Sequence, residues 1–134
     1  MSVDYEKLID ERSQVVFEAM EGRVPEEDMV RLHQAFDLAR HAHADQKRKT
    51  GEPYILHPIA VATICAKELM LSTNPVIAAF LHDVVEDTDF TIDDIESRFG
   101  HDVAFLVRVV TKQKKDKYDE SKQVDNYKQM LDSV

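Results

Sequence analysis

Apolar residues recur at helical spacing along the first third of the chain. From Asp4 to Glu21 they follow a loose period of three to four residues, and Gly22 then offers a stop. Pro25 suits the first turn of a second helix, which we expect to run to about Gln46. Its apolar stripe predicts one histidine that faces inward, because the stripe consists of Met29, Leu32, Phe36, Ala39 and His43.

The middle of the chain carries further helical patterns separated by breaks. An apolar run from Pro58 to about Leu71 ends at Ser72–Pro75, and a second apolar run follows this break. Thr91 and Asp94 then resemble a capping box, in which Asp takes the place of the more usual Glu. This spacing predicts three successive helices, the last of them short.

The remaining sequence completes a helical pattern from end to end. Gly100 closes the short helix, and the very apolar run after it predicts a core helix from His101 to about Lys112. A last helix is expected to begin near Ser121. With three glycines and no Asn-Gly or Asp-Gly hairpin signature, the sequence predicts an all-α fold, a compact helical bundle.

Size and charge narrow the classes of function. The 134 residues suit one domain spanning 1–134, and the net charge of -9 argues against general affinity for nucleic acid or for anionic membranes. Cys65 is the only cysteine, so an intrachain disulfide is excluded. The N-terminus lacks the features of a signal peptide, and no apolar run reaches membrane-spanning length, so we expect a cytoplasmic protein.

One polar segment stands out at the end of the run that follows Pro75. Read as a continuous helix at roughly 100° per residue, His82, Asp83, Glu86 and Asp87 fit inside an arc of about 140° and share a face. One interpretation is a core histidine beside a solvated helix end. The other is a metal site, because three carboxylates near the negative end of a helix need a counter-charge that a divalent cation supplies.

Two more segments bear on such a site. His57 precedes Pro58 at an expected helix entrance, which is a stiff mounting for a metal ligand, whereas His43 by itself fits a core histidine. Separated histidines with a His-Asp pair form a mixed nitrogen and oxygen set, which suits Mn, Fe or Zn better than Ca or Mg. The basic cluster at residues 47–49 is either a solvated surface or the local positive charge that a phosphorylated substrate needs.

These residues belong to a longer succession with a consistent order and spacing from about His43 to Lys112. It consists of His43, Gln46, Arg48, Gly51-Glu52-Pro53-Tyr54, His57-Pro58, His82-Asp83-Val84-Val85-Glu86-Asp87-Thr88, Phe99-Gly100 and Val110-Thr111-Lys112. The succession resembles the HD-superfamily hydrolase domain of RelA/SpoT-type enzymes, which stand-alone small alarmone hydrolases share. It is far more specific than an isolated His-Asp pair.

The resemblance implies an all-helical hydrolase that binds one Mn²⁺ and removes pyrophosphate from the 3′ position of guanosine (p)ppGpp, giving GDP or GTP. It also implies a role for each matching residue. These roles are metal ligands for His57, His82 and Asp83, catalytic acids for Glu86 and Asp87, and substrate binding for Arg48, Lys49 and Thr50.

The sequence departs from the family pattern in two ways. Asp45 stands where the family usually has Gly. The family's fourth metal ligand, an Asp in a later helix, is expected beyond residue 134 together with the closing helices, so we expect an incomplete bundle that self-associates. Two alternatives stay open: a catalytically weak HD module that binds nucleotide or a partner protein, and a hydrolase of another nucleotide phosphate such as NADPH.

Overall fold

The computed structural model describes residues 3–116, whose regular structure is helical. Helix α1 (Tyr5–Met20) and helix α2 (Glu26–Ala42) come first, and residues 43–55 connect α2 to α3 (Leu56–Thr63). The chain continues through a π-helix, η1 (Ile64–Glu68), into α4 (Thr73–Leu81), α5 (Val84–Asp87), α6 (Ile92–Phe99) and α7 (His101–Asp116). The predicted all-α class is confirmed. The helix expected near Ser121 lies outside the described residues.

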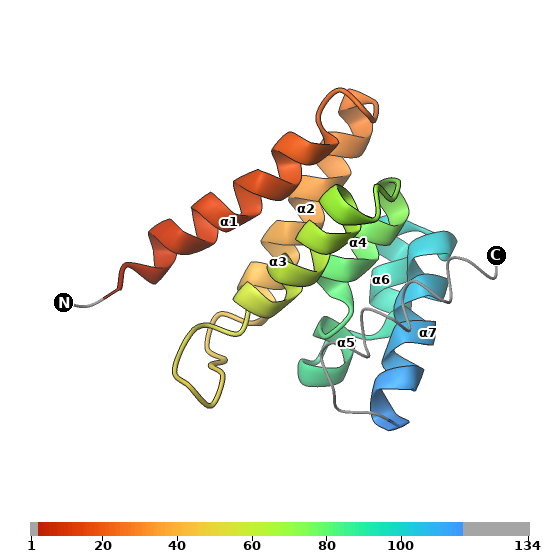
Figure 1. Ribbon diagram of the computed structural model, residues 1–134. Helices are drawn as coiled ribbons and strands as arrows, with labels where there is room; N and C mark the ends of the chain where they lie inside the picture. The colour runs from red at the N-terminus through yellow and green to blue at the C-terminus, as the bar shows by residue number, and fades with distance from the viewer. Residues whose placement is uncertain (1–2, 117–134) are drawn as a thin grey trace.

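Helix α4 forms the centre of the core. It lies between α2 and α3 on one side and α7 on the other, and it packs against all three (Figure 1). From Pro75 to Leu81 every residue of α4 is buried. Burial on all sides explains why this stretch is apolar throughout. Because His82 and Asp83 follow α4 directly, the centre of the core fixes where they lie.

The helix boundaries differ from the predicted ones at the places that carry polar residues. The predicted continuous helix through His82 and Asp87 is wrong, because α4 ends at Leu81 and α5 begins at Val84. The prediction that His57 precedes its helix is also wrong, since His57 lies in the first turn of α3. A proline is tolerated in a first turn, so Pro58 does not have to begin the helix.

The predicted helix from Pro58 to Leu71 changes type partway along. Its second half is the π-helix η1, and the chain leaves it through Met70, whose φ is 54°. Arg23, just after α1, holds this segment with its guanidinium group, which donates to the carbonyl oxygens of Ala66 and Leu71, each at 2.9 Å. Cys65 is buried in η1, and burial raises the pKa of its thiol to about 12.

Two predicted features are confirmed closely. Thr91 and Asp94 form a capping box, in which the Thr91 side chain accepts from the Asp94 N–H and the Asp94 side chain accepts from the Thr91 N–H. Gly100 follows α6 with a φ of 96°, a conformation that favours glycine. Among residues 3–116, no helix combines the length and apolar character needed to cross a membrane.

Candidate active site

Three candidate ligands come from two different parts of the chain. His57 lies in the first turn of α3, whereas His82 and Asp83 form the link between α4 and α5. All three are buried, and Asp83 is 0% exposed. A fully buried carboxylate is costly unless other groups offset its charge, so this arrangement requires a local explanation.

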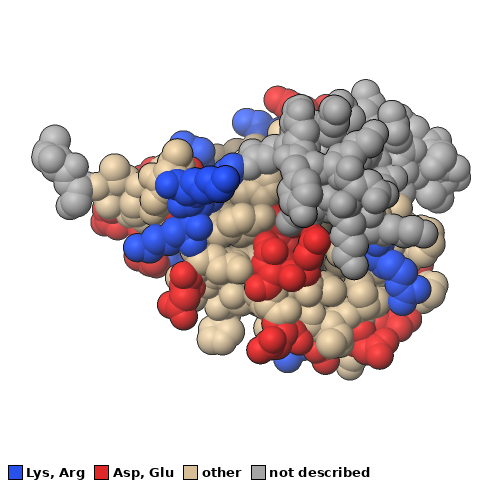
Figure 2. Space-filling model, turned by 90° about the horizontal axis from the view of Figure 1, so that it is seen from below, with Lys and Arg blue, Asp and Glu red and all other residues tan. Residues whose placement is uncertain are grey.

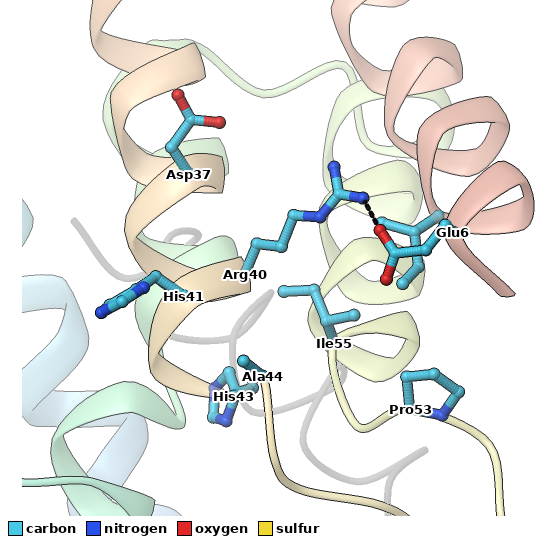
Figure 3. Close-up of a pocket in the computed structure, with 9 residues that line it drawn as sticks. Glu6, Asp37, Arg40, His41, His43, Ala44, Pro53 and Ile55 are labelled. Atoms are coloured by element: carbon cyan, nitrogen blue, oxygen red, sulfur yellow. Dashed lines mark hydrogen bonds and ion pairs between the residues drawn. The ribbon is translucent and has the colours of Figure 1, made fainter.

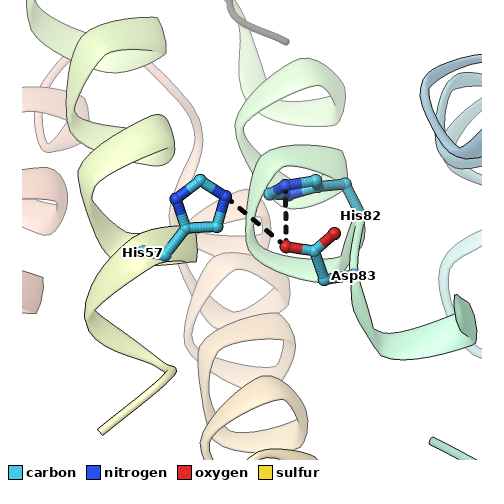
Figure 4. Close-up of side chains that lie close together, drawn as sticks. All are labelled: His57, His82 and Asp83. Carbon is cyan, nitrogen blue, oxygen red and sulfur yellow. Dashed lines mark ion pairs between the residues drawn. The ribbon is translucent and has the colours of Figure 1, made fainter. Parts of the chain in front are cut away.

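The three side chains converge on one oxygen atom. His57 Nε2 lies 3.5 Å and His82 Nε2 lies 3.1 Å from Asp83 Oδ2, and the candidate ligand atoms all lie within 4.8 Å of one another (Figure 4). The structure therefore brings together His57, His82 and Asp83, as the sequence predicts. They are the one group of three potential metal-ligating side chains found within the described part of the chain.

The protonation of His82 fits metal binding. Its Nδ1 lies 2.6 Å from the carbonyl oxygen of Ala79, which can only accept a hydrogen bond, so Nδ1 carries the proton and donates. When the ring is neutral, its lone pair therefore lies on Nε2, the nitrogen that is 3.1 Å from Asp83 Oδ2. Two histidine nitrogens and a carboxylate oxygen are a donor set that a divalent transition metal accepts. The residues present can therefore hold such an ion.

Tyr54 adds a hydrogen bond to the same oxygen. Its hydroxyl group donates to Asp83 Oδ2 at 2.6 Å, and its ring packs against His43 and His57 with centroid separations of 4.9 and 5.7 Å. Burial, together with the nearby charge of Asp83, raises the pKa of Tyr54 well above its usual value. The hydroxyl group therefore remains a donor at neutral pH.

A second polar contact joins the end of α2 to α5. His43 is buried, as predicted, and its Nδ1 contacts Gln46 Oε1, while Gln46 Nε2 donates to the backbone oxygen of Asp87 at 3.1 Å. Burial lowers the pKa of His43, against the opposing effect of the Gln46 contact. These contacts fix the position of the backbone that carries the candidate catalytic acids.

Those acids lie outside the buried cluster. Glu86 and Asp87 are exposed on α5, one turn beyond the buried Asp83. The break before α5 thus separates the buried candidate ligands from the exposed candidate acids. Acidic side chains gather in several groups on the face shown in Figure 2, in keeping with the net charge of -9.

The predicted substrate-binding residues lie in a folded loop, residues 47–53, which we name the basic strap. A β-bridge pairs Lys47 with Pro53, and the Arg48 N–H donates to the Glu52 carbonyl oxygen at 2.9 Å.

The side chains of the strap also contact one another. The Thr50 hydroxyl group donates to Glu52 Oε2 at 2.6 Å, while Arg48 Nε lies 3.8 Å from Glu52 Oε1. Arg48 is half-buried, whereas Lys49 and Thr50 are exposed. Figure 1 places the strap at the same end of the bundle as α5.

A cavity of about 330 Å³ lies between α1, α2 and the two ends of the loop that connects α2 to α3. Arg40 reaches across it from α2 to form an ion pair with Glu6 of α1 (Figure 3). It forms a second ion pair with Asp10 of the same helix. His43 lies on one wall of this cavity. The cavity therefore borders the residues that support the candidate site without including the three candidate ligands.

The sequence alone predicts no role for Tyr54 or Gln46. Their place in the succession that resembles the RelA/SpoT-type domain is the one signal in the sequence that points to them. Their contacts with Asp83 and Asp87 join residues that are 29 and 41 positions apart. Local spacing carries no information about contacts of that kind.

Comparison with known proteins agrees with this geometry. A guanosine-3′,5′-bis(diphosphate) 3′-pyrophosphohydrolase of Aquifex aeolicus is 49% identical over 100 residues, which cover 75% of this chain and 14% of that protein. The bifunctional (p)ppGpp synthase/hydrolase SpoT of Escherichia coli is 47% identical over 110 residues, covering 81% and 16%. The chain thus spans only about a sixth of these relatives.

A solved structure supports the same relationship. It is described as a metazoan ortholog of SpoT that hydrolyses ppGpp, and it shares 37% identity with a TM-score of 0.61 over 72% of this chain and 55% of that one. The sequence profile of a family described as HD domain matches residues 35–134, which include the strap and all three candidate ligands. The chain therefore belongs to the HD domain family, and its homologues are proteins of the SpoT/RelA type.

Proposed function

We propose that this chain is a metal-dependent hydrolase that removes the 3′ pyrophosphate from (p)ppGpp and leaves GDP or GTP. The observation that carries the proposal is the convergence of His57, His82 and Asp83, all buried, within 4.8 Å of one another. Relatives that are 47–49% identical across this region are named for reactions of (p)ppGpp. The proposed unit is a single HD domain spanning 1–134, acting in the cytoplasm.

The proposed metal is one Mn²⁺ ion held by His57, His82 and Asp83. When bound, a divalent metal supplies Lewis-acid chemistry, which acidifies water and offsets negative charge on a phosphoryl group. The mixed nitrogen and oxygen donor set supports Mn²⁺ over Mg²⁺, which prefers oxygen ligands. Because Ala79 fixes the tautomer of His82, the lone pair of Nε2 is presented without prior rearrangement.

The other residues bind substrate and move protons. We assign to Glu86 or Asp87 the acceptance of a proton from the attacking water, since both are exposed on α5 just beyond Asp83. Arg48 carries a planar cation that can stack on the guanine base, and Lys49 offers a point charge for phosphate oxygens. The Thr50 hydroxyl group lies in the same strap and can donate to a phosphate oxygen by exchanging its present acceptor, Glu52 Oε2.

Product analysis tests this proposal. The chain is incubated with ppGpp and Mn²⁺, and separately with NADPH and Mn²⁺, and the products are separated by ion-exchange chromatography. We expect GDP and pyrophosphate in equal amounts from ppGpp, no reaction after chelation of the metal, and little conversion of NADPH. Preferential conversion of NADPH would redirect the assignment of substrate, and release of single phosphate from ppGpp would contradict the proposed position of cleavage.

A further inference from the structure

Tyr54 occupies a position between the metal centre and the basic strap. It directly follows the strap, and its N–H donates to the carbonyl oxygen of Gln46, the residue directly before the strap, at 3.0 Å. Its hydroxyl group at the same time donates to Asp83 Oδ2 at 2.6 Å. One residue thus closes the base of the strap and contacts a candidate metal ligand.

The oxygen that Tyr54 contacts is the one on which both histidines converge. A carboxylate oxygen has two lone pairs, so Asp83 Oδ2 can accept the tyrosine hydrogen bond and still face His57 and His82. A hydrogen bond of this kind fixes the direction in which a carboxylate presents its free lone pair. Partners that orient a ligating carboxylate in this way contribute to metal affinity.

The other end of the strap is tied to the same part of the molecule. Gln46 donates to the backbone oxygen of Asp87, so the two residues that flank the strap contact the two ends of the segment from Asp83 to Asp87. The Tyr54 ring is held between His43 and His57, which limits its movement. A shift of Asp83 is therefore transmitted to the base of the strap.

We infer that Tyr54 is a positioning residue that couples metal occupancy at Asp83 to the order of the basic strap. This inference rests on the proposed function, because it requires Asp83 to ligate the metal. Binding of a metal would hold Asp83 in one orientation, and Tyr54 would then hold the strap in the conformation that presents Arg48 and Lys49. Since coupling between sites is reciprocal, an anion bound to the strap strengthens metal binding by the same factor.

The test compares Tyr54→Phe, which removes only the hydroxyl group, with Tyr5→Phe at the start of α1 as the matched control. Titration calorimetry with Mn²⁺ should show that Tyr54→Phe binds the ion about 10- to 100-fold more weakly, whereas Tyr5→Phe matches the wild type. With Co²⁺ as the probe, the visible absorption bands of Tyr54→Phe should shift. A merely structural role would leave these bands unchanged.

Hydrogen–deuterium exchange then measures how well the backbone of the strap is ordered. In the wild type, Mn²⁺ should slow exchange of the amides of Arg48, Gly51 and Tyr54, which are hydrogen-bonded at and within the strap. In Tyr54→Phe at saturating Mn²⁺ this slowing should be lost. Gln46→Ala removes the hydrogen bond from the Gln46 side chain to the backbone oxygen of Asp87. This variant should keep most of its Mn²⁺ affinity.

The outcomes separate the inference from the function on which it rests. A wild-type protein that binds no Mn²⁺ overturns both. A wild type that binds Mn²⁺ without slower exchange in the strap overturns the coupling alone, and this result does not depend on how any variant folds. Equal Mn²⁺ affinity for Tyr54→Phe and the wild type overturns the role of the hydroxyl group.

Discussion

At the scale of single residues, Asp83 concentrates the chemistry of the site. Its buried Oδ2 accepts a hydrogen bond from Tyr54 and lies near a nitrogen atom of each of two histidines. A negative charge in that position is stabilised by hydrogen bonding and, in the proposed function, by a cation. Replacing Asp83 therefore affects both the buried charge and the geometry of its neighbours.

The lowered pKa of His43 predicts that the stability of the protein depends on pH. Burial lowers this pKa in the folded protein below the ordinary value of 6.5. Well above pH 6.5 the ring is neutral in both the folded and the unfolded protein. As the pH falls below it, the unfolded chain takes up a proton that the folded protein resists, so the free energy of unfolding decreases.

The measurement compares thermal unfolding of the wild type and His43→Asn between pH 7.5 and 5 without metal. The wild type should lose more stability than the variant across the acidic part of this range. Parallel pH profiles for the two proteins would contradict a lowered pKa for His43.

The sequence predicts the identity of the candidate ligands better than their surroundings. His57, His82 and Asp83 were predicted from motif and spacing, and the structure brings them together. The hydrogen bond from Tyr54 was not predicted, because it depends on how α3 packs against α4. The roles of Arg48, Glu86 and Asp87 stay predictions.

At the scale of elements, the break between α4 and α5 separates the buried and exposed parts of the site. Periodicity alone predicts a continuous helix there, because the apolar positions keep a helical spacing through Val85. The π-helix η1 was missed for a similar reason, since a local widening of a helix leaves little trace in an apolar run. The capping box at Thr91 was predictable because it depends on two nearby side chains.

The hydrogen bonds of the Arg23 side chain predict that it contributes to the stability of η1. Its guanidinium group donates to three carbonyl oxygens, those of Ala19, Ala66 and Leu71. Arg23→Ala should lower the free energy of unfolding by about 1 kcal/mol, because the side chain is exposed and water competes for these hydrogen bonds. Urea unfolding followed by circular dichroism measures this change.

Arg108→Ala is the matched control for Arg23→Ala, because Arg108 is exposed, as Arg23 is, but lies on a different element, α7. This control should change the free energy of unfolding by less than about 0.5 kcal/mol. An equal decrease in the free energy of unfolding for the two variants would show that the Arg23 hydrogen bonds do not stabilise the fold.

At the scale of the whole molecule, a protein with a net charge of -9 is proposed to bind a highly anionic nucleotide. Local positive charge resolves this conflict, since the basic strap lies at the same end of the bundle as α5 (Figure 1). The proposed affinity should therefore fall as salt screens the strap. The all-α architecture was predictable from periodicity, whereas the position of the strap at the same end of the bundle as α5 required the tertiary structure.

Self-association is a further prediction at this scale. Phe105 of α7 is 47% exposed, although the same helix contributes Val103, Leu106 and Val107 to the core. Sedimentation velocity should show an average mass that rises with protein concentration, and Phe105→Glu should reduce this rise. Met70→Glu, at a more exposed apolar residue outside the helices, is the matched control. A monomer at all concentrations would contradict the prediction.

The measurement that tests the central claim most directly is Mn²⁺-dependent release of pyrophosphate from ppGpp by the wild type, His82→Ala and His101→Ala. His101 is a matched control because its side chain is 79% exposed. We predict release by the wild type and by His101→Ala, and none above background by His82→Ala or without metal. Equal release by His82→Ala and the wild type, or release that persists after the metal is removed, would contradict the account.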